Sequence, residues 1–359
     1  MARCSGSVTG RGIAHNLRRH YSPWLLRGVV TLLLVANIIN LGADLGAMGA
    51  ALELLIGGPE QLYTLLFGVV CIVLEVWLSY PRYAAILKWT TLSLFSYVAV
   101  VFVADVPWGA ALKSLFVPSI ELTGAYAMAM VAILGTTISP YLFFWQASQE
   151  VEEERKIGRR IVNEREGATD DELRRSRTDV LTGMFFSNLV MYFIILTTAA
   201  TLHAQGKTSI DTAQQAAEAL KPLAGNGAYL LFTLGLIGTG MLGVPVLAGA
   251  AAYAVAEAMN WRGTLEDRPR LAKKFYAIVA ASMVLGLGLD YAGFNAVKML
   301  FWSAVLNGVL APPLIVLVVL LTSNKKVMGG RVNPPLLKWL GWATAVVMAV
   351  AAVAMFVTM

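Results

Sequence analysis

The stretch Gly135-Thr136-Thr137-Ile138-Ser139-Pro140-Tyr141 interrupts a long apolar run near the middle of the chain. Apolar residues precede it over Ala125–Leu134 and follow it over Leu142–Trp145, and together these pieces are long enough to cross a bilayer. Proline has no backbone N–H to donate, and its ring clashes with the preceding turn of a helix. We therefore predict that this span is a broken helix at membrane depth, with Gly135 and Pro140 marking the break.

A broken helix inside a membrane has two interpretations. Backbone groups without partners are costly in lipid unless protein or a water-lined cavity satisfies them. In secondary transporters, the freed carbonyls and helix ends bind the substrate or its coupling ion. Alternatively, the proline only kinks the helix, and neighbouring hydroxyl groups satisfy the backbone. The stretch by itself leaves both interpretations open.

The composition independently predicts a membrane protein whose main environment is the lipid bilayer. Hydrophobic residues make up 57% of the 359 residues and charged residues only 14%, and the mean hydropathy is +0.66. Soluble domains carry about 25% charged residues. The start of the chain, Met1–Tyr21, is basic and polar, so it does not resemble a cleavable secretory signal. Cys4 and Cys71 are too far apart to suggest a disulfide framework or a thiolate metal site.

The hydropathy pattern predicts an all-α, polytopic fold. We expect a cytoplasmic segment over 1–23 and a single transmembrane domain over 24–358. The nine apolar spans run near 24–55, 61–80, 83–105, 125–149, 180–203, 227–256, 275–290, 295–322 and 336–358.

Basic residues predict the orientation of these spans. If the N-terminus is cytoplasmic, 24 of the 28 Lys and Arg residues fall in cytoplasmic segments. We therefore expect a multi-pass protein of the cell membrane with its N-terminus inside and its C-terminus outside. This placement in alternate loops also argues against nucleic acid as the partner of the net charge of +6.

The charged loop over 150–179 has two interpretations. Its carboxylates precede a run of basic residues, and Glu152 and Lys156 form a favourable i,i+4 pair. This pattern is typical of a solvated helix that extends the fourth span into the cytoplasm. The alternative is a cluster of carboxylates that captures metal ions.

Polar side chains inside the spans are candidates for an ion or proton pathway. Asn37, Asn40 and Asp44 are spaced to share one face of the first span, and small residues around them permit close helix packing. An intramembrane carboxylate is costly, so Asp44 belongs either to such a pathway or to a buried structural pair. Glu75 is either buried or near the inner surface. Asn307 lies in the eighth span close to two prolines, where a second unwound site is possible.

No pattern in the sequence predicts an enzyme. His15, His20 and His203 lie outside the spans and beside no nucleophile or second ligand, so neither a zinc site nor a catalytic triad is indicated. A Gly-rich phosphate loop of the Walker type is also missing, which argues against an ATP-driven pump. We expect no cofactor.

Three stretches along the chain carry a resemblance to a known family: Ala43–Gly46, continuing to Gly49–Leu52, then Gly135–Pro140, and finally Thr322–Gly329. With them the sequence resembles the Nramp family of divalent metal transporters, in particular its bacterial Nramp-related branch, over nearly the whole chain. The Gly-rich sixth span is also similar to the eighth helix of that family.

The resemblance implies a LeuT-type fold, in which two five-helix repeats have opposite topology and a further helix follows. It implies that the protein moves divalent metal cations by alternating access, with the metal as substrate. The fourth span matches the sixth helix of the family, so the first helix and most of the second have no counterpart in this chain. We therefore expect an N-terminally incomplete bundle that lacks the Asp-Pro-Gly-Asn-type motif, which carries half of the metal site.

At matched positions the chain departs from the family pattern. Ser139 replaces the usual Met before the proline, and Tyr141 replaces the usual His after it. Asp44 matches a family Asp, but Asn37 and Ala47 replace the acidic residues around it. Hydroxyl and carbonyl oxygens suit harder cations such as Mg²⁺, whereas a thioether suits softer ions of the Mn or Fe type. These departures leave the preferred ion and proton coupling open.

The predicted metal half-site uses Ser139 and the backbone carbonyls near Thr136 and Thr137. Asp44 sets the local electrostatics, and Asn37, Asn40, Tyr141 and Asn307 are helper or pathway candidates. Two other functions stay open: a LeuT-type carrier of other small solutes, and a non-transporting membrane scaffold or sensor that docks partners through 150–179. The sequence does not indicate an oligomeric state.

Overall fold

Long helices account for most of the chain. The computed structural model describes residues 1–77, 85, 89–104, 106–117, 121, 123–159, 161–261, 263–265, 267 and 269–358, and no strand occurs among them. Eight helical segments there are long and apolar enough to cross a membrane, which agrees with the all-α, polytopic prediction. They consist of α3 (Pro23–Ile56), α4 (Glu60–Trp77), α8 (Gly124–Thr137) with α9 (Pro140–Lys156), α11 (Asp170–Thr201), α14 (Ala228–Met259), α15 (Lys273–Tyr291), α16 (Ala296–Ser323) and α18 (Pro335–Thr358).

The span predicted near 83–105 does not form one long helix in its described part. A 3-10 helix, η1 (Thr90–Leu94), leads into the short helix α6 (Phe95–Val100). Residues 83–84, 86–88 and 105 of this prediction lie outside the described residues. The Ser96 hydroxyl donates a hydrogen bond to the carbonyl of Ser93, and such local bonds compete with regular helix.

The second unwound site that the sequence leaves possible in the eighth span does not form. Helix α16 is continuous and contains both Pro312 and Pro313. Prolines are tolerated inside a membrane helix when neighbouring helices support it. Helix α16 packs against α3, α8 and α18, so it is supported along most of its length.

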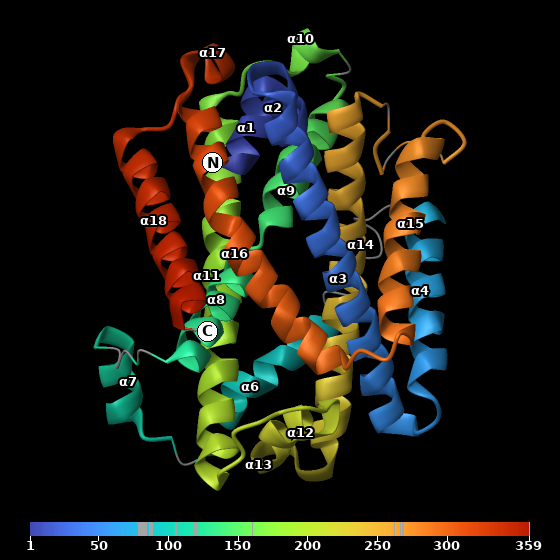
Figure 1. Cartoon of the computed structure of the whole chain (residues 1–359), viewed down its shortest axis with the longest axis vertical. Helices are drawn as coiled ribbons and strands as arrows, with labels where there is room; N and C mark the ends of the chain where they lie inside the picture. Colours follow the sequence, from blue (N-terminus) through green and yellow to red (C-terminus); the bar gives the residue numbers. More distant parts are fainter. Residues whose placement is uncertain are drawn as a thin grey trace.

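Helix α3 lies at the centre of the fold. It packs along α14, α15, α4 and α16, while α8 packs against α16 and α18. Figure 1 shows α16 running obliquely between the group that contains α8 and α18 and the group that contains α14, α15 and α4. A Cβ atom at Gly42 of α3 would overlap the carbonyl oxygen of Gly286 in α15. Small residues at this crossing therefore permit close backbone contact, as is common in membrane bundles.

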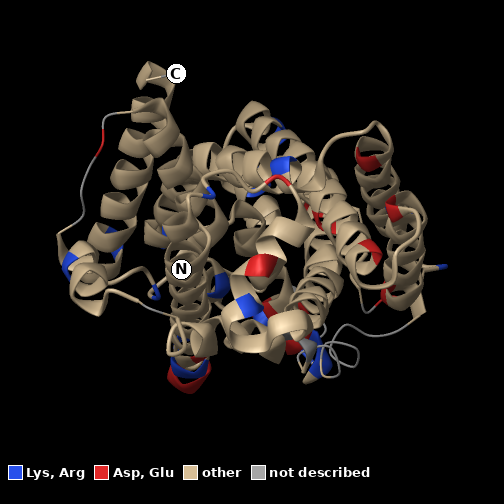
Figure 2. Cartoon of the chain, turned by 90° about the horizontal axis from the view of Figure 1, so that it is seen from below, with Lys and Arg blue, Asp and Glu red and all other residues tan. Residues whose placement is uncertain are grey.

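The connecting segments gather at the two ends of the bundle. Helices α1 (Ala2–Thr9), α2 (Ile13–His20), α10 (Val162–Arg165) and α17 (Lys325–Met328) lie at one end, the upper one in Figure 1, and α12 (Ala213–Ala217) lies at the other. Most of the ribbon carries neither acidic nor basic residues (Figure 2). The end that holds α1, α2, α10 and α17 contains the loops in which the sequence concentrates Lys and Arg.

The charged segment 150–179 is tied to the start of the chain. The Arg3 side chain forms ion pairs with Glu150 and Asp179, and it lies 3.6 Å from a carboxylate oxygen of Glu153. Helix α9 therefore extends beyond the apolar part of its span, as the sequence predicts, and its charged end packs on α1.

Histidine 15 makes the end that carries α2 sensitive to pH. Burial, followed by the charges of Arg11, Arg18 and Arg19, lowers the pKa of His15 from its usual 6.5. The folded chain then binds this proton more weakly than the unfolded chain does, so stability is complete above the unfolded pKa and is lost as the pH falls through it.

We expect the thermal unfolding temperature of the detergent-solubilised chain to fall between about pH 7.5 and about pH 5.5. The substitution His15→Gln should make that fall smaller, because the side chain at this position can then no longer take up a proton. Identical pH dependence in the wild-type chain and in His15→Gln would contradict the expectation.

Candidate functional site

The fourth predicted span is divided into two helices within the stretch Gly135–Tyr141. Helix α8 ends at Thr137 and α9 begins at Pro140. Between them, Ile138 has φ −117° and ψ 68°, and Ser139 has φ −75° and ψ 121°, so neither residue is helical. Proline is well suited to the first position of α9, where its missing N–H is not needed.

The break leaves carbonyl oxygens at the end of α8 without their usual partners. In a continuous helix the Thr136 carbonyl would accept from the N–H of residue 140, but Pro140 has none. The Ser139 hydroxyl instead donates to the carbonyl oxygens of Gly135 and Thr136, at 3.2 and 3.1 Å. The Thr137 hydroxyl points back along α8, where it donates to the carbonyls of Ile133 and Leu134. The groups gathered at the break are therefore one hydroxyl and several backbone carbonyls.

Helix α16 holds the end of α8 in place through two glycines. A Cβ atom at Gly135 would overlap the carbonyl oxygen of Ala304 and the backbone nitrogen of Gly308, and a Cβ atom at Gly308 would overlap the carbonyl oxygen of Val131. The two backbones therefore touch directly at this crossing. The contact fixes the position of the last turn of α8, whose carbonyls are those exposed by the break.

A cavity of about 260 Å³ lies beside the break. Ser139, which is 5% exposed, and Thr137 line it, together with Phe143 and Gln146 from α9. Phe143 and Gln146 are not among the site residues predicted from the sequence. Their spacing from Ser139, four and seven residues, is the helical pattern that could have identified them.

The polar side chains of α3 make two kinds of contact: Asn37 forms a hydrogen bond to a neighbouring helix, and Asp44 lies close to other polar groups. The Asn37 side chain is buried and donates to the Leu247 carbonyl of α14, at 2.9 Å. Asp44 is partly buried and faces α14, since its Oδ2 atom is 3.6 Å from where a Cβ atom on Gly243 would stand. Tyr141 lies within electrostatic range of Asp44, and its hydroxyl is hydrogen-bonded to the Ser139 side chain.

The structure therefore brings Ser139, Tyr141 and the carbonyls of 135–137 together, with Asp44 next to Tyr141. Asp44 does not line the cavity beside Ser139. Asn40 is buried one turn from Asp44, and Asn307 is buried on α16 next to Gly308. Within the described part of the chain, no group of three or more His, Cys, Asp or Glu side chains is placed to hold a metal ion.

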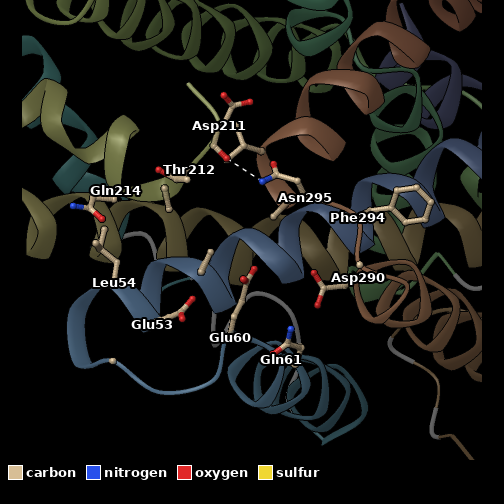
Figure 3. Close-up of a pocket in the computed structure, with 16 residues that line it drawn as sticks. Glu53, Leu54, Glu60, Gln61, Asp211, Thr212, Gln214, Asp290, Phe294 and Asn295 are labelled. Atoms are coloured by element: carbon tan, nitrogen blue, oxygen red, sulfur yellow. Dashed lines mark hydrogen bonds between the residues drawn. The ribbon is translucent and has the colours of Figure 1, made fainter. Parts of the chain in front are cut away.

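A second, larger cavity of about 710 Å³ lies at the end of the bundle opposite α1 and α2. Four carboxylates from separate elements line it: Glu53, Glu60 and Asp290 on one side and Asp211 across from them (Figure 3). Asp290 is only 8% exposed, and folding brings all four into one cavity.

The sequence matches the family described as "Natural resistance-associated macrophage protein-like" over residues 1–358. The chain belongs to the Nramp family. This membership confirms the resemblance stated from the three sequence stretches, and it agrees with the expectation that the protein is not an enzyme.

Curated relatives of this Nramp chain include two bacterial proteins named divalent metal cation transporter MntH. The one from Mesorhizobium japonicum is 28% identical, over 96% of this chain and 75% of the relative. The one from Klebsiella pneumoniae is also 28% identical, over 94% of this chain and 77% of the relative.

Solved structures support the fold of this Nramp chain. The manganese transporter of Eremococcus coleocola, in complex with an aromatic bis-isothiourea substituted compound, superimposes with a TM-score of 0.73. The match is 17% identical and covers 98% of this chain and 75% of that one. A mutant of the same transporter gives a TM-score of 0.71. The predicted LeuT-type fold is thereby confirmed.

Proposed function

We propose that this Nramp chain moves divalent metal cations across the membrane and that its broken helix supplies one half of the ion site. The names of the MntH relatives support the class of substrate. The main support for the position of the ion site is the pair of hydrogen bonds from the Ser139 hydroxyl to the carbonyls of Gly135 and Thr136. The Ser139 side chain is buried, and these oxygens lie at the break in an apolar span, where they can replace the water shell of an ion.

Ion binding at this half-site requires a small local rearrangement. The Ser139 hydroxyl now donates to the two carbonyls, so it would rotate its hydrogen away and turn a lone pair toward the cation. The carbonyls of Gly135, Thr136 and Thr137 would then face the same ion. Asp44, acting next to Tyr141, would add a negative charge that favours a cation over a neutral solute.

The attachments of the two half-helices support alternating access. Helix α8 is held to α16 by the contact between Gly135 and Gly308. Helix α9 is held to α1, since a Cβ atom at Gly6 would overlap the backbone carbonyl of Ala147. The non-helical residues Ile138 and Ser139 lie between two separately anchored pieces, so a change at this joint would move one anchor relative to the other.

The orientation that we propose has the end with α1 and α2 in the cytoplasm and the end of α18 outside. The distribution of 24 of 28 basic residues supports it. The cavity lined by Glu53, Glu60, Asp211 and Asp290 then faces outward. Carboxylates concentrated in a recess raise the local concentration of cations, so this cavity would attract the substrate toward the bundle.

The oxygen atoms at the break favour certain ions over others. Oxygen ligands suit harder cations such as Mg²⁺, and the position before Pro140 offers a hydroxyl rather than a thioether. We propose that the site accepts Mg²⁺ along with Mn²⁺ or Fe²⁺. The metal is the substrate in this proposal, and no cofactor takes part.

The two alternative functions receive less support. Family membership favours a metal ion over the organic substrates of other LeuT-type carriers. A scaffold that docks partners through 150–179 would need that segment to be accessible. Arg3 already engages Glu150 and Asp179 within it.

Removal of the Ser139 hydroxyl tests the half-site. The chain is reconstituted into liposomes, and Mn²⁺ and Mg²⁺ uptake are measured for the wild type, Ser139→Ala and the matched control Ser187→Ala, whose side chain is exposed on α11. We expect Ser139→Ala to lower uptake about tenfold, since loss of one hydrogen-bonding group at a buried site costs about 1–3 kcal/mol.

Ser187→Ala should transport like the wild type. Equal uptake by Ser139→Ala and the wild type would show that the Ser139 hydroxyl does not bind the ion. A wild-type chain that binds neither cation and moves neither would contradict the proposed function itself.

A further inference from the structure

Glu75 is a buried carboxyl group that the proposed ion site does not use. It lies in the last turn of α4 and is 4% exposed. Neither of its carboxylate oxygens has a hydrogen-bond partner among the described residues. It does not line the cavity beside Ser139.

The surroundings of Glu75 on α4 are apolar. Cys71, one turn earlier, belongs to the largest apolar cluster of the bundle, and its sulfur lies 3.7 Å from the sulfur of Met241 in α14. Ile72, Leu74 and Val76 pack against the same cluster. Glu75 is thus placed in a part of the protein that solvates a negative charge poorly.

No cation on the neighbouring helices is available to Glu75 within the part of the chain that the structure describes. Helix α4 packs against α3, α14 and α15. Cys71, one turn earlier on α4, and Asp44 on α3 carry no positive charge.

The remaining charged and titratable groups on these helices have other contacts or lie elsewhere. Arg27 lies over Trp24, Lys274 lies over Trp261, and Lys273 is exposed. Tyr253 bonds to Glu152, Glu257 accepts from Ser148, and Tyr276 donates to Leu265. Lys221 lies over the ring of Tyr229, and the groups at the opposite end of α4 are Glu53, Glu60, Tyr63, Asp290 and Tyr291.

An ionised carboxylate in such a place is strongly destabilising, because burial removes its hydration and nothing replaces it. A proton on the group removes most of that cost, as buried groups without a partner take up their neutral form. An ionisable residue inside a membrane bundle also calls for a functional explanation.

We propose that Glu75 is a proton-binding site: its carboxyl group holds a proton in this conformation and gives it to water when α4 moves away from α3 and α15. In that step the O–H bond of the acid breaks, water gains the proton as hydronium, and a hydrated carboxylate remains. This release rests on the proposed function, since it needs the bundle to change conformation during transport.

Infrared difference spectroscopy tests the proton directly. Spectra of the reconstituted chain are recorded at neutral and alkaline pH for the wild type, Glu75→Gln and the control Asp171→Asn, which removes an exposed carboxylate from α11. We expect the wild type and Asp171→Asn to show at neutral pH the C=O stretch of a protonated carboxyl that is missing in Glu75→Gln. An unchanged band in Glu75→Gln would overturn the proposal.

Transport measurements test the release step. Mn²⁺ uptake by the wild type should slow toward alkaline pH, because a water-facing carboxylate then fails to recover its proton, with a change of up to about tenfold per pH unit for a one-proton step. Glu75→Gln, which is always neutral, should lose this dependence, and Glu75→Asp should restore it.

The outcomes separate this inference from the proposed function. If the wild type shows the band but moves no cation, the proton site stands and the transport proposal fails. If uptake occurs and Glu75→Gln keeps the wild-type pH profile, the release step is wrong. Glu75→Leu serves as a check on folding: it should raise the thermal unfolding temperature, since it replaces a buried group without partners.

Discussion

Replacing Gly135 with leucine should abolish divalent-cation uptake. Even a Cβ atom at this position would overlap the backbone of Ala304 and Gly308, and backbone atoms cannot rotate away as a flexible side chain can. Helices α8 and α16 would have to separate, so the last turn of α8 would no longer present its carbonyls at the break. Loss of direct contact between helices removes the van der Waals packing that holds membrane bundles together.

The control for this prediction is Gly183→Leu. Gly183 lies on the exposed side of α11, and a Cβ atom there would have no neighbour within 4 Å. Both variants are compared with the wild type by size-exclusion chromatography in detergent and by Mn²⁺ uptake into liposomes. Gly183→Leu should match the wild type in both measurements, and wild-type uptake by Gly135→Leu would show that the crossing of α8 and α16 does not position the site.

The second large effect is expected from Ser139→Met. A thioether in place of the hydroxyl would face the same freed carbonyls and would bind softer ions better than harder ones. We expect the ratio of Mn²⁺ to Mg²⁺ uptake to rise at least about tenfold, which corresponds to about 1.4 kcal/mol of differential binding.

Competition experiments in liposomes measure this ratio, with Cd²⁺ as a third and softer competitor. Ser139→Ala is the matched control, because it removes the hydroxyl oxygen without adding sulfur. It should lower uptake of both ions without favouring Mn²⁺. An unchanged ratio in Ser139→Met would mean that this side chain does not contact the transported ion.

The main features of the fold follow from local sequence patterns. Apolar runs locate most of the long helices to within a few residues, although α11 begins ten residues before its predicted span. Pro140 identifies the division between α8 and α9 because its missing N–H has a local effect. The same reasoning fails at Pro312 and Pro313, where packing on three neighbouring helices keeps α16 continuous. Whether a membrane proline breaks its helix therefore depends on contacts that the sequence does not display.

The candidate site also depends on contacts between distant residues that the sequence does not display. The freed carbonyls could be anticipated from Pro140 alone, but the contact of Gly135 with Gly308 joins residues far apart in the chain. The cavity that unites Glu53, Glu60, Asp211 and Asp290 likewise depends on the arrangement of separate elements. The depth of Glu75 was undecided from its position near the end of a span, and the packing of α4 on α3 and α15 settles it.

The joint at Ile138 and Ser139 gives α9 the mechanics of a lever arm. Helix α9 has 17 residues beyond that pivot, and at about 1.5 Å per residue its length is about 25 Å. A tilt of about 10° would sweep the far tip of such a rod through about 4 Å, which exceeds the diameter of a water molecule. Arg3 forms an ion pair with Glu150, the eleventh of the 17 residues of α9, so this contact would resist the movement about two thirds of the way along the arm.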